Sequence, residues 1–203
     1  MTWVWKLGGS LNARPVLRDW LRLAATEGAG RVVVVPGGGA FTQQVREAQA
    51  AWHFDDVAAH RMAILGMAQT ALMLAALEPS LALAGDAAAI EAGLARGLAV
   101  VWLPLDVMSD WPGIEPGWGV SADSLALWLA QRLGAAGLAL VKSCRIEPGR
   151  SFEELSASGV LDAQFPARAA QAALPIELLG HDETARARRL VAARPSLQRG
   201  VAS

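Results

Sequence analysis

A regular alternation of short apolar runs with longer helical segments constrains this fold more than any other feature. Residues 32–35 are four consecutive valines, a pattern typical of a strand buried on both faces of a sheet. Further strands are expected at residues 3–7, 81–84, 100–103, 138–141 and 176–179. This alternation predicts an α/β fold, namely a three-layer αβα sandwich with a central, mainly parallel sheet.

The segments between the strands carry apolar residues at helical spacing. Helices are expected at residues 15–25, 40–52, 58–77, 87–96, 121–133, 151–157, 166–173 and 183–193. Residues 108–120 are rich in Gly, Pro and Trp and are expected to form a loop. Its Trp111 and Trp118 are either core residues or aromatic surfaces on which a flat substrate could stack.

Length and composition narrow the class of protein. A chain of 203 residues predicts one domain, residues 1–203. The one cysteine, Cys144, excludes a disulfide scaffold and fits a cytoplasmic protein. A net charge of −1 gives no global basic field for nucleic acid. The apolar stretch 64–77 contains Gln69 and Thr70 and is shorter than the roughly 20 residues of a membrane span, so no membrane partner is expected.

Lysine is nearly absent, although basic residues are not. Of 18 basic residues only two, Lys6 and Lys142, are lysine, and the others are arginine. Lysine offers a compact, point-like ammonium that arginine does not reproduce. The two remaining lysines are therefore candidates for a role that needs more than charge.

Three segments place glycines or a lysine where a strand ends. They are Lys6-Leu7-Gly8-Gly9-Ser10, Pro36-Gly37-Gly38-Gly39 and Lys142-Ser143. Ligands of open α/β sheets bind beyond the carboxyl ends of the strands, and glycine lets backbone N–H groups approach an anion closely. The pattern favours phosphate binding, with tight turns as the alternative. It includes no P-loop and no G-x-G-x-x-G after the first strand.

A fourth segment, residues 118–126, opens a helix. Ser121 is a candidate N-cap, and Asp123 falls in the first turn, where the helix dipole favours a carboxylate. That reading is purely structural. In the functional alternative, Asp123 lies between Lys6 and Lys142 and holds both ammonium groups against their mutual repulsion.

Taken together, these segments resemble the amino acid kinase family. Residues 6–10 resemble its K-x-G-G-S motif, residues 33–39 its V-V-x-G-G-G segment and residues 119–126 its N-S-D-x-L-A segment, while residues 140–143 resemble the strand that opens its nucleotide site. The motifs occur in the family's order over roughly residues 1–182. The resemblance implies ATP- and Mg-dependent phosphoryl transfer to a small acceptor in a homo-oligomer, with the acceptor bound by the N-terminal half and the nucleotide by the C-terminal half.

The resemblance also implies roles for individual residues. Three are catalytic: Lys6, Asp123 and Lys142. The phosphates and nucleotide would contact Gly8, Gly9, Ser10 and Ser143. The acceptor would contact Gly37, Gly38, Gly39, His60 and Asp162. For His60 the alternative is a structural or solvated histidine on a helix. No side chain is assigned as a metal ligand.

Within the family, the chain resembles a small subgroup of kinases of methanofuran-type cofactor biosynthesis. The short length, His60-Arg61-Met62-Ala63 and residues 160–166 carry this resemblance. It implies an aminomethylfuran-methanol phosphate as acceptor, which is phosphorylated to the diphosphate. Asp162 would pair with the amine of that acceptor, the alternative being an ordinary loop aspartate.

Two departures from the family pattern leave other functions open. Cys144-Arg145-Ile146 follows Ser143, where many members have a turn with aspartate and glycine, and no lysine follows Lys142, where many members have a second catalytic one. Lys142, Arg145 or Arg168 would have to supply that charge. The alternatives are a non-catalytic nucleotide- or phosphate-binding subunit and another α/β protein that binds small molecules.

Overall fold

A computed structural model describes residues 1–106 and 116–192 of the chain. Its sheet has six strands in the order β3-β4-β2-β1-β5-β6, and every neighbouring pair is parallel. The strands are β1 (Trp3–Leu7), β2 (Val32–Pro36), β3 (Ala82–Ala84), β4 (Val100–Trp102), β5 (Gly137–Lys142) and β6 (Ile176–Gly180). The predicted parallel sheet is confirmed.

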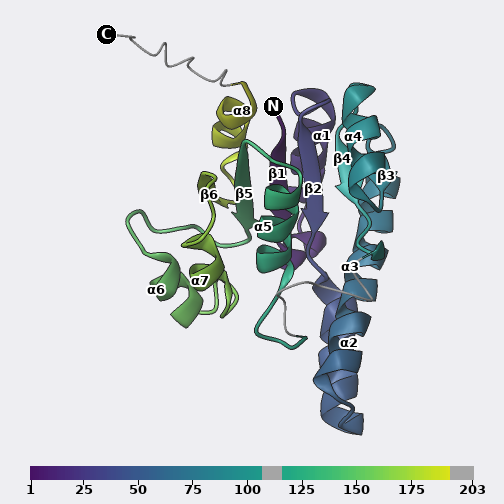
Figure 1. The fold of residues 1–203 in the computed structure, drawn as a ribbon, viewed down its shortest axis with the longest axis vertical. Helices are drawn as coiled ribbons and strands as arrows, with labels where there is room; N and C mark the ends of the chain where they lie inside the picture. The colour runs from purple at the N-terminus through teal and green to yellow at the C-terminus, as the bar shows by residue number, and fades with distance from the viewer. Residues whose placement is uncertain (107–115, 193–203) are drawn as a thin grey trace.

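Helices lie on both faces of this sheet, which confirms the predicted three layers (Figure 1). They are α1 (Leu17–Thr26), α2 (Gly39–Trp52), α3 (Asp56–Leu77), α4 (Ala87–Ala95), α5 (Ala122–Arg132), α6 (Phe152–Ala157), α7 (Phe165–Ala169) and α8 (Thr184–Ala192), together with the short 3₁₀ helix η1 (Gly9–Ala13).

The alternation of side chains along each strand creates two separate cores. Val33 and Val35 of β2 face the core that contains α5, whereas Val32 and Val34 face the core that contains α1 and α8. All four valines are fully buried. The run of four valines is therefore apolar throughout because both faces of β2 are covered.

Local capping explains where the structure departs from the expected boundaries. The helix expected from residue 58 begins at Asp56, because the side chain of Asp55 accepts a hydrogen bond of 2.7 Å from the backbone N–H of Ala58. No sequence pattern predicted η1, and α7 is shorter than expected. Trp111 and the end of the last predicted helix, Ala193, lie outside the described residues.

Helix α3 is the one described helix with the length and composition of a membrane span. Its apolar stretch is thus longer than residues 64–77 suggested. In this fold, however, Ile64 and Met67 pack into one core and Ala71 and Leu74 into the other, which is the position of a core helix. The homo-oligomeric state and the cytoplasmic location remain predictions.

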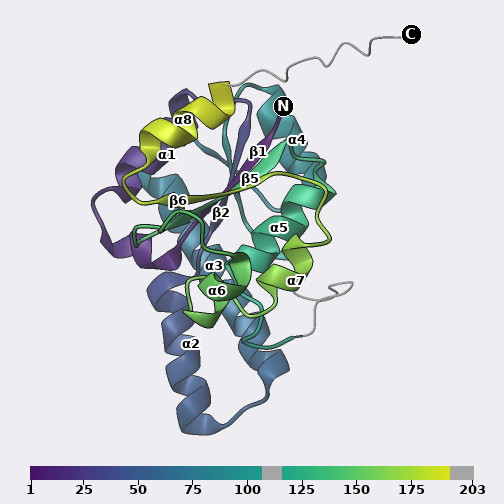
Figure 2. The same cartoon turned by 90° about the vertical axis from the view of Figure 1, so that its left-hand side faces the viewer.

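Figures 1 and 2 show that α2 and the first half of α3 form a hairpin that projects past the carboxyl ends of the strands. Helix α2 starts directly after β2, and α5 packs against β1 and β5. The hairpin, the start of α5 and the ends of β1 and β5 therefore surround one end of the sheet. The glycine-containing segments and both lysines lie there.

Two leucines of α3 allow a matched test of this packing. Leu74 is fully buried, whereas the side chain of Leu72 on the same helix is 54% exposed. We expect Leu74→Ala to lower the free energy of unfolding by about 2–5 kcal/mol, because it leaves a cavity in the core. Leu72→Ala should change it by no more than about 0.5 kcal/mol. Urea unfolding measures both, and equal losses would contradict this placement of α3.

Candidate functional site

Asp123 lies between the two lysines of the chain. The Nζ atom of Lys6 is 2.8 Å from Asp123 Oδ1, and that of Lys142 is 2.7 Å from Oδ2 and 2.8 Å from Oδ1. Asp123 is 2% exposed, and each lysine is 6% exposed. Two ammonium groups and one carboxylate thus form a nearly buried cluster with a net positive charge, which we call the Lys–Asp–Lys cluster.

The fold brings these three residues together from distant parts of the chain. Lys6 lies near the end of β1 and Lys142 at the end of β5, and these two strands are neighbours in the sheet. Asp123 lies in the first turn of α5, where Ser121 accepts its backbone N–H at 3.2 Å. The predicted N-cap is therefore confirmed, and it occurs together with the predicted bridge between the lysines.

Burial and mutual attraction oppose each other in this cluster. Burial by itself would raise the pKa of Asp123, but the two neighbouring ammonium groups hold that pKa below its usual value. Burial and the repulsion from Lys6 lower the pKa of Lys142 to about 8, although the attraction of Asp123 opposes them. Lys142 therefore changes its charge close to physiological pH.

Asp162 supports the cluster from the side. Its carboxylate accepts hydrogen bonds from the backbone N–H groups of Ser121 and Ser124, at 2.9 and 3.0 Å, and from their hydroxyls, at 3.0 and 2.7 Å. A carboxylate at a helix N-terminus is favourable because it neutralises unpaired N–H groups there. The structure therefore places Asp162 on the start of α5, with its oxygens already engaged, rather than pointing at a substrate amine.

The two glycine loops touch each other at the end of the sheet. A Cβ atom on Gly9 would lie 2.7 Å from the Cα of Gly39, and one on Gly37 would lie 2.8 Å from the Cα of Gly9. Gly39 also has a φ of +56°, which L side chains rarely adopt. These positions need glycine for the close approach of the loops, so this requirement accounts for part of the glycine pattern.

The amides that remain for a ligand are fewer than the motifs suggest. Gly8 donates its N–H to the Val141 carbonyl at 3.0 Å, and Gly37 donates its N–H to the Leu7 carbonyl at 2.9 Å. Gly9 and Gly39 open helices, where the first N–H groups have no partner within the helix. The N–H groups that these loops could donate to a phosphate therefore belong to the residues that follow Gly8 and Gly37.

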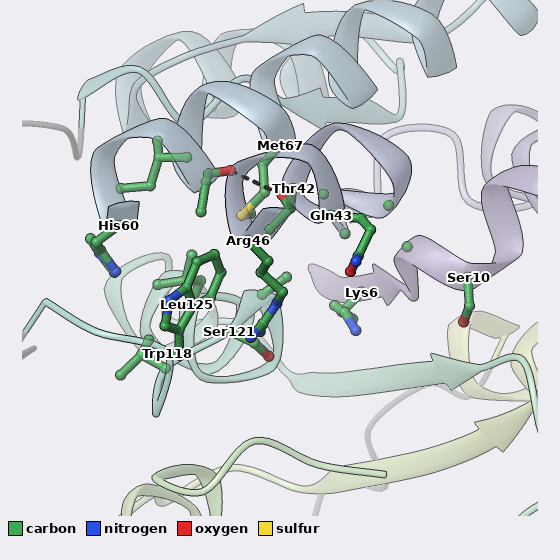
Figure 3. Close-up of a pocket in the computed structure, with 18 residues that line it drawn as sticks. Lys6, Ser10, Thr42, Gln43, Arg46, His60, Met67, Trp118, Ser121 and Leu125 are labelled. Atoms are coloured by element: carbon green, nitrogen blue, oxygen red, sulfur yellow. Dashed lines mark hydrogen bonds between the residues drawn. The ribbon is translucent and has the colours of Figure 1, made fainter. Parts of the chain in front are cut away.

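Two cavities meet at the cluster. One, of about 280 Å³, extends between α2, α3 and α5, and Figure 3 shows the residues around it. The other, of about 480 Å³, is bordered by Asp123, Lys142, Ser143 and the segment 159–163. Lys6, Ser10 and Arg46 border both of them. We call them the α2–α3 cavity and the β5 cavity.

The residues predicted for the phosphates and the acceptor divide between these cavities. Gly37, Gly38, Gly39 and His60 border the α2–α3 cavity, whereas Gly8, Ser143 and Asp162 border the β5 cavity. Gly9 and Ser10 border both. The hydroxyl of Ser10 donates a hydrogen bond of 2.7 Å to that of Ser143, which connects the β1 and β5 loops.

His60 is half-buried on α3, at the end of the α2–α3 cavity away from Lys6 (Figure 3). Burial lowers its pKa, although a hydrogen bond with the backbone of Gly117 opposes this shift. The imidazole is therefore mainly neutral at pH 7. It can accept or donate a hydrogen bond there but contributes little positive charge.

Sequence reasoning missed Arg46 and Gln49 of α2. The guanidinium carbon of Arg46 lies 3.8 Å from the ring centroid of Trp118, and the indole N–H of Trp118 donates to the Gln49 side chain at 2.6 Å. Arg46 and Gln49 are three positions apart on the helix, so they share a face. This spacing shows in the sequence that Arg46 and Gln49 lie on one face of the helix, but it does not show that Trp118 is their partner.

A third cavity, of about 690 Å³, lies beside β6 and is bordered by Arg145, Arg150 and Arg186. Lys142, Arg145 and Arg168 are the residues that could replace the family's second catalytic lysine. Of these, Arg145 borders the cavity beside β6 and Arg168 belongs to α7. Lys142 is the one that lies with Lys6 on Asp123. Within residues 1–106 and 116–192 no cluster of three His, Cys, Asp or Glu side chains could hold a metal ion.

The charge of Lys142 can be measured directly, because a chain with two lysines gives two lysine side-chain signals. With ¹³Cε-labelled lysine, we expect the NMR signal that Lys142→Met removes to titrate near pH 8. In Asp123→Asn this midpoint should fall further, because the attraction that favours the charged form is lost. A Lys142 signal that titrates in the ordinary range, about 10.4, would contradict the described cluster.

The sequence of this chain is similar to that of a curated protein. A curated relative from Methanocaldococcus jannaschii, named [5-(aminomethyl)furan-3-yl]methyl phosphate kinase, is 28% identical over 131 residues, which are 63% of this chain and 59% of that protein. The alignment thus spans less than two thirds of the relative's length.

Solved structures share the whole fold. The uridylate kinase from Archaeoglobus fulgidus superposes with a TM-score of 0.68 at 17% identity, over 96% of this chain and 97% of that one. The UMP kinase from Bacillus anthracis gives 0.70 at 16% identity, over 95% and 92%. The model of the amino acid kinase family matches residues 1–144, which include Lys6, Asp123 and Lys142. The chain therefore belongs to the amino acid kinase family.

Proposed function

We propose that this protein is a kinase that transfers the γ-phosphoryl group of ATP to the phosphate of a small acceptor. The observation that carries the proposal is the Lys–Asp–Lys cluster at the junction of two cavities. Phosphoryl transfer needs positioning and positive charge more than a covalent group on the protein. The cluster supplies that charge where a donor and an acceptor would meet.

The reaction balances without a proton transfer to the protein. An oxygen of the acceptor phosphate dianion forms a bond to the γ-phosphorus of ATP. The bond from that phosphorus to the β–γ bridging oxygen breaks, and ADP leaves with the electron pair. Lys6 borders both cavities and is the residue we assign to the transferring group, with Lys142 on the β5 side.

ATP and Mg²⁺ fit the residues around the cluster. The β5 cavity offers Lys142, Ser143 and the start of η1 to phosphate oxygens. The first two residues support a donor site in the C-terminal half of the chain, to which the N-terminal η1 also contributes. Asp123 and Asp162 both border that cavity, but their oxygens are already hydrogen-bonded. Mg²⁺ commonly keeps several waters and binds through substrate phosphates, so we expect the phosphates and water to hold most of it.

The α2–α3 cavity favours a phosphate acceptor over an alcohol. Its described lining includes no Asp or Glu, and its neutral imidazole, His60, lies at the end of the cavity away from Lys6, too far along to take a proton from a hydroxyl group beside Lys6. A phosphate monoester has its second pKa near 6 and is already a dianion at pH 7. Such an acceptor needs no base, and it would meet Lys6 and the Gly37–Gly39 loop.

For the acceptor itself we propose the aminomethylfuran-methanol phosphate. Support comes from the name of the Methanocaldococcus jannaschii relative and from Leu125 and Met67, which offer apolar surface to a flat ring, whereas the Trp118 ring is stacked against Arg46. Asp162, the residue predicted to pair with the amine, borders the β5 cavity. In this proposal the phosphate and the ring contribute most of the recognition.

The test is a coupled assay of ADP release with ATP, Mg²⁺ and [5-(aminomethyl)furan-3-yl]methyl phosphate, with UMP as a second acceptor. We expect the furan phosphate to give a diphosphate product. Lys6→Met and Asp123→Asn should each lower kcat by about 10²–10³-fold, because each removes charge or order at the transferring group. Phosphorus NMR identifies the product.

Asp19→Asn serves as a matched control, since Asp19 is an exposed carboxylate in the first turn of α1. It should leave kcat unchanged. Full activity in both cluster variants would refute the assigned roles. Calorimetry could instead detect binding of ATP–Mg while no ADP is released with either acceptor. The protein would then be a nucleotide-binding subunit, the alternative that the missing lysine after Lys142 favours.

A further inference from the structure

Arg46 is an exposed arginine that stacks on an aromatic ring and, within the described residues, has no carboxylate partner. Its guanidinium stacks on Trp118 at 3.8 Å, and within the described residues it forms no ion pair with an Asp or Glu. Stacking on an aromatic face orients a planar guanidinium while leaving its N–H groups free to bind a ligand. Arg46 therefore carries an oriented but uncompensated positive charge.

The ring under Arg46 is itself held in place. Gln49, one turn further along α2, accepts the indole N–H of Trp118 at 2.6 Å. Trp118 belongs to the segment that leads into Ser121 and α5. Two residues of one helix thus hold the tryptophan, by its face and by its N–H, and the three side chains together connect α2 to the start of α5.

Arg46 lies where the two cavities meet. It borders the α2–α3 cavity together with Lys6 and also the β5 cavity, but not the cavity beside β6. Figure 3 shows its side chain reaching from α2 toward Trp118 and Ser121, into the space beside Lys6. Its helix begins at the Gly37–Gly39 loop after β2, and β2 lies on the opposite side of β1 from β5, the strand of Lys142.

The charge of the bound phosphates would exceed what the Lys–Asp–Lys cluster can offset, so a further positive group is needed at the junction. The Lys–Asp–Lys cluster has one net positive charge, whereas an acceptor phosphate and a triphosphate together carry several negative ones. An arginine fork matches the geometry of phosphate oxygens, and its hydrogen bonds are stronger than those between neutral groups. A lysine in the same place would supply charge but no planar stack on Trp118.

We propose that Arg46 binds the phosphate of the acceptor and so selects phosphate esters over the corresponding alcohols. The inference rests on the proposed kinase function and adds to it the residue that reads the acceptor. Trp118 acts through Arg46 as a positioning residue, because it holds the guanidinium over the junction.

The test compares Arg46→Gln, Arg46→Lys and Trp118→Leu with the unmodified protein in steady-state kinetics. Arg46→Gln should lower kcat/KM for the furan phosphate by about ten- to a hundredfold, mainly through KM. KM for ATP should change by less than about twofold. The kcat/KM of Arg46→Lys for the furan phosphate should lie between those of the unmodified protein and Arg46→Gln, because lysine keeps the charge but lacks the forked guanidinium. Trp118→Leu should lower the same kcat/KM by less than Arg46→Gln does. Arg22→Gln, at an exposed arginine of α1, is the matched control and should behave as the unmodified protein.

Calorimetry with the furan phosphate and with its dephosphorylated alcohol separates this inference from the proposed function. The unmodified protein should prefer the phosphate ester, and Arg46→Gln should lose most of that preference. If turnover is normal and Arg46→Gln keeps the preference, the inference is wrong and the kinase function stands. An effect on KM for ATP alone would also overturn it. If the unmodified protein prefers the ester but releases no ADP, the kinase function fails while the binding comparison still decides the role of Arg46.

Discussion

The geometry of the site depends on one buried carboxylate between two ammonium groups. Two lysines side by side in a nearly buried position would repel each other and lose hydration, and Asp123 offsets both costs through contacts of 2.7–2.8 Å. In return, the lysines keep Asp123 ionised despite its burial. None of the three charges is favourable there alone, so the cluster requires all three. This mutual dependence explains how two positive side chains can be held at a fixed spacing at the end of a sheet.

That cluster in turn requires the surrounding fold. Neighbouring parallel strands β1 and β5 set the spacing of the lysines, and α5 presents Asp123 from its first turn. Asp162 fixes that turn through Ser121 and Ser124. The glycine loops then approach closely enough to leave two cavities that meet at Lys6. In the proposed function, the acceptor and the donor occupy one cavity each, and the cluster stabilises the negative charge that passes between them.

Periodicity predicted the layers and the parallel sheet, because these follow from local patterns. The approach of Asp123 to both lysines was one of two interpretations of its position, the other being an ordinary carboxylate at a helix start, and the family resemblance favoured it. Contacts between distant segments carry no such pattern. The stack of Arg46 on Trp118 joins a helix to a loop about seventy residues away, and the sequence does not pair them. For Asp162 the sequence left two roles open, the partner of a substrate amine and an ordinary loop aspartate, since only the folded chain brings it to the start of α5. For the loop glycines the sequence favoured phosphate binding over tight turns, whereas the fold shows that close loop contacts also require glycine and that the amides of Gly8 and Gly37 are already bonded to strand carbonyls.

The most direct measurement of the central claim is a crystal structure with a non-hydrolysable ATP analogue and Mg²⁺. We expect the terminal phosphate at the junction of the two cavities, with the Nζ atoms of Lys6 and Lys142 within hydrogen-bond distance of its oxygens and Asp123 still between them. A structure in which the analogue lies elsewhere, or in which either lysine turns away from the phosphates, would contradict the claim that this cluster is the centre for phosphoryl transfer.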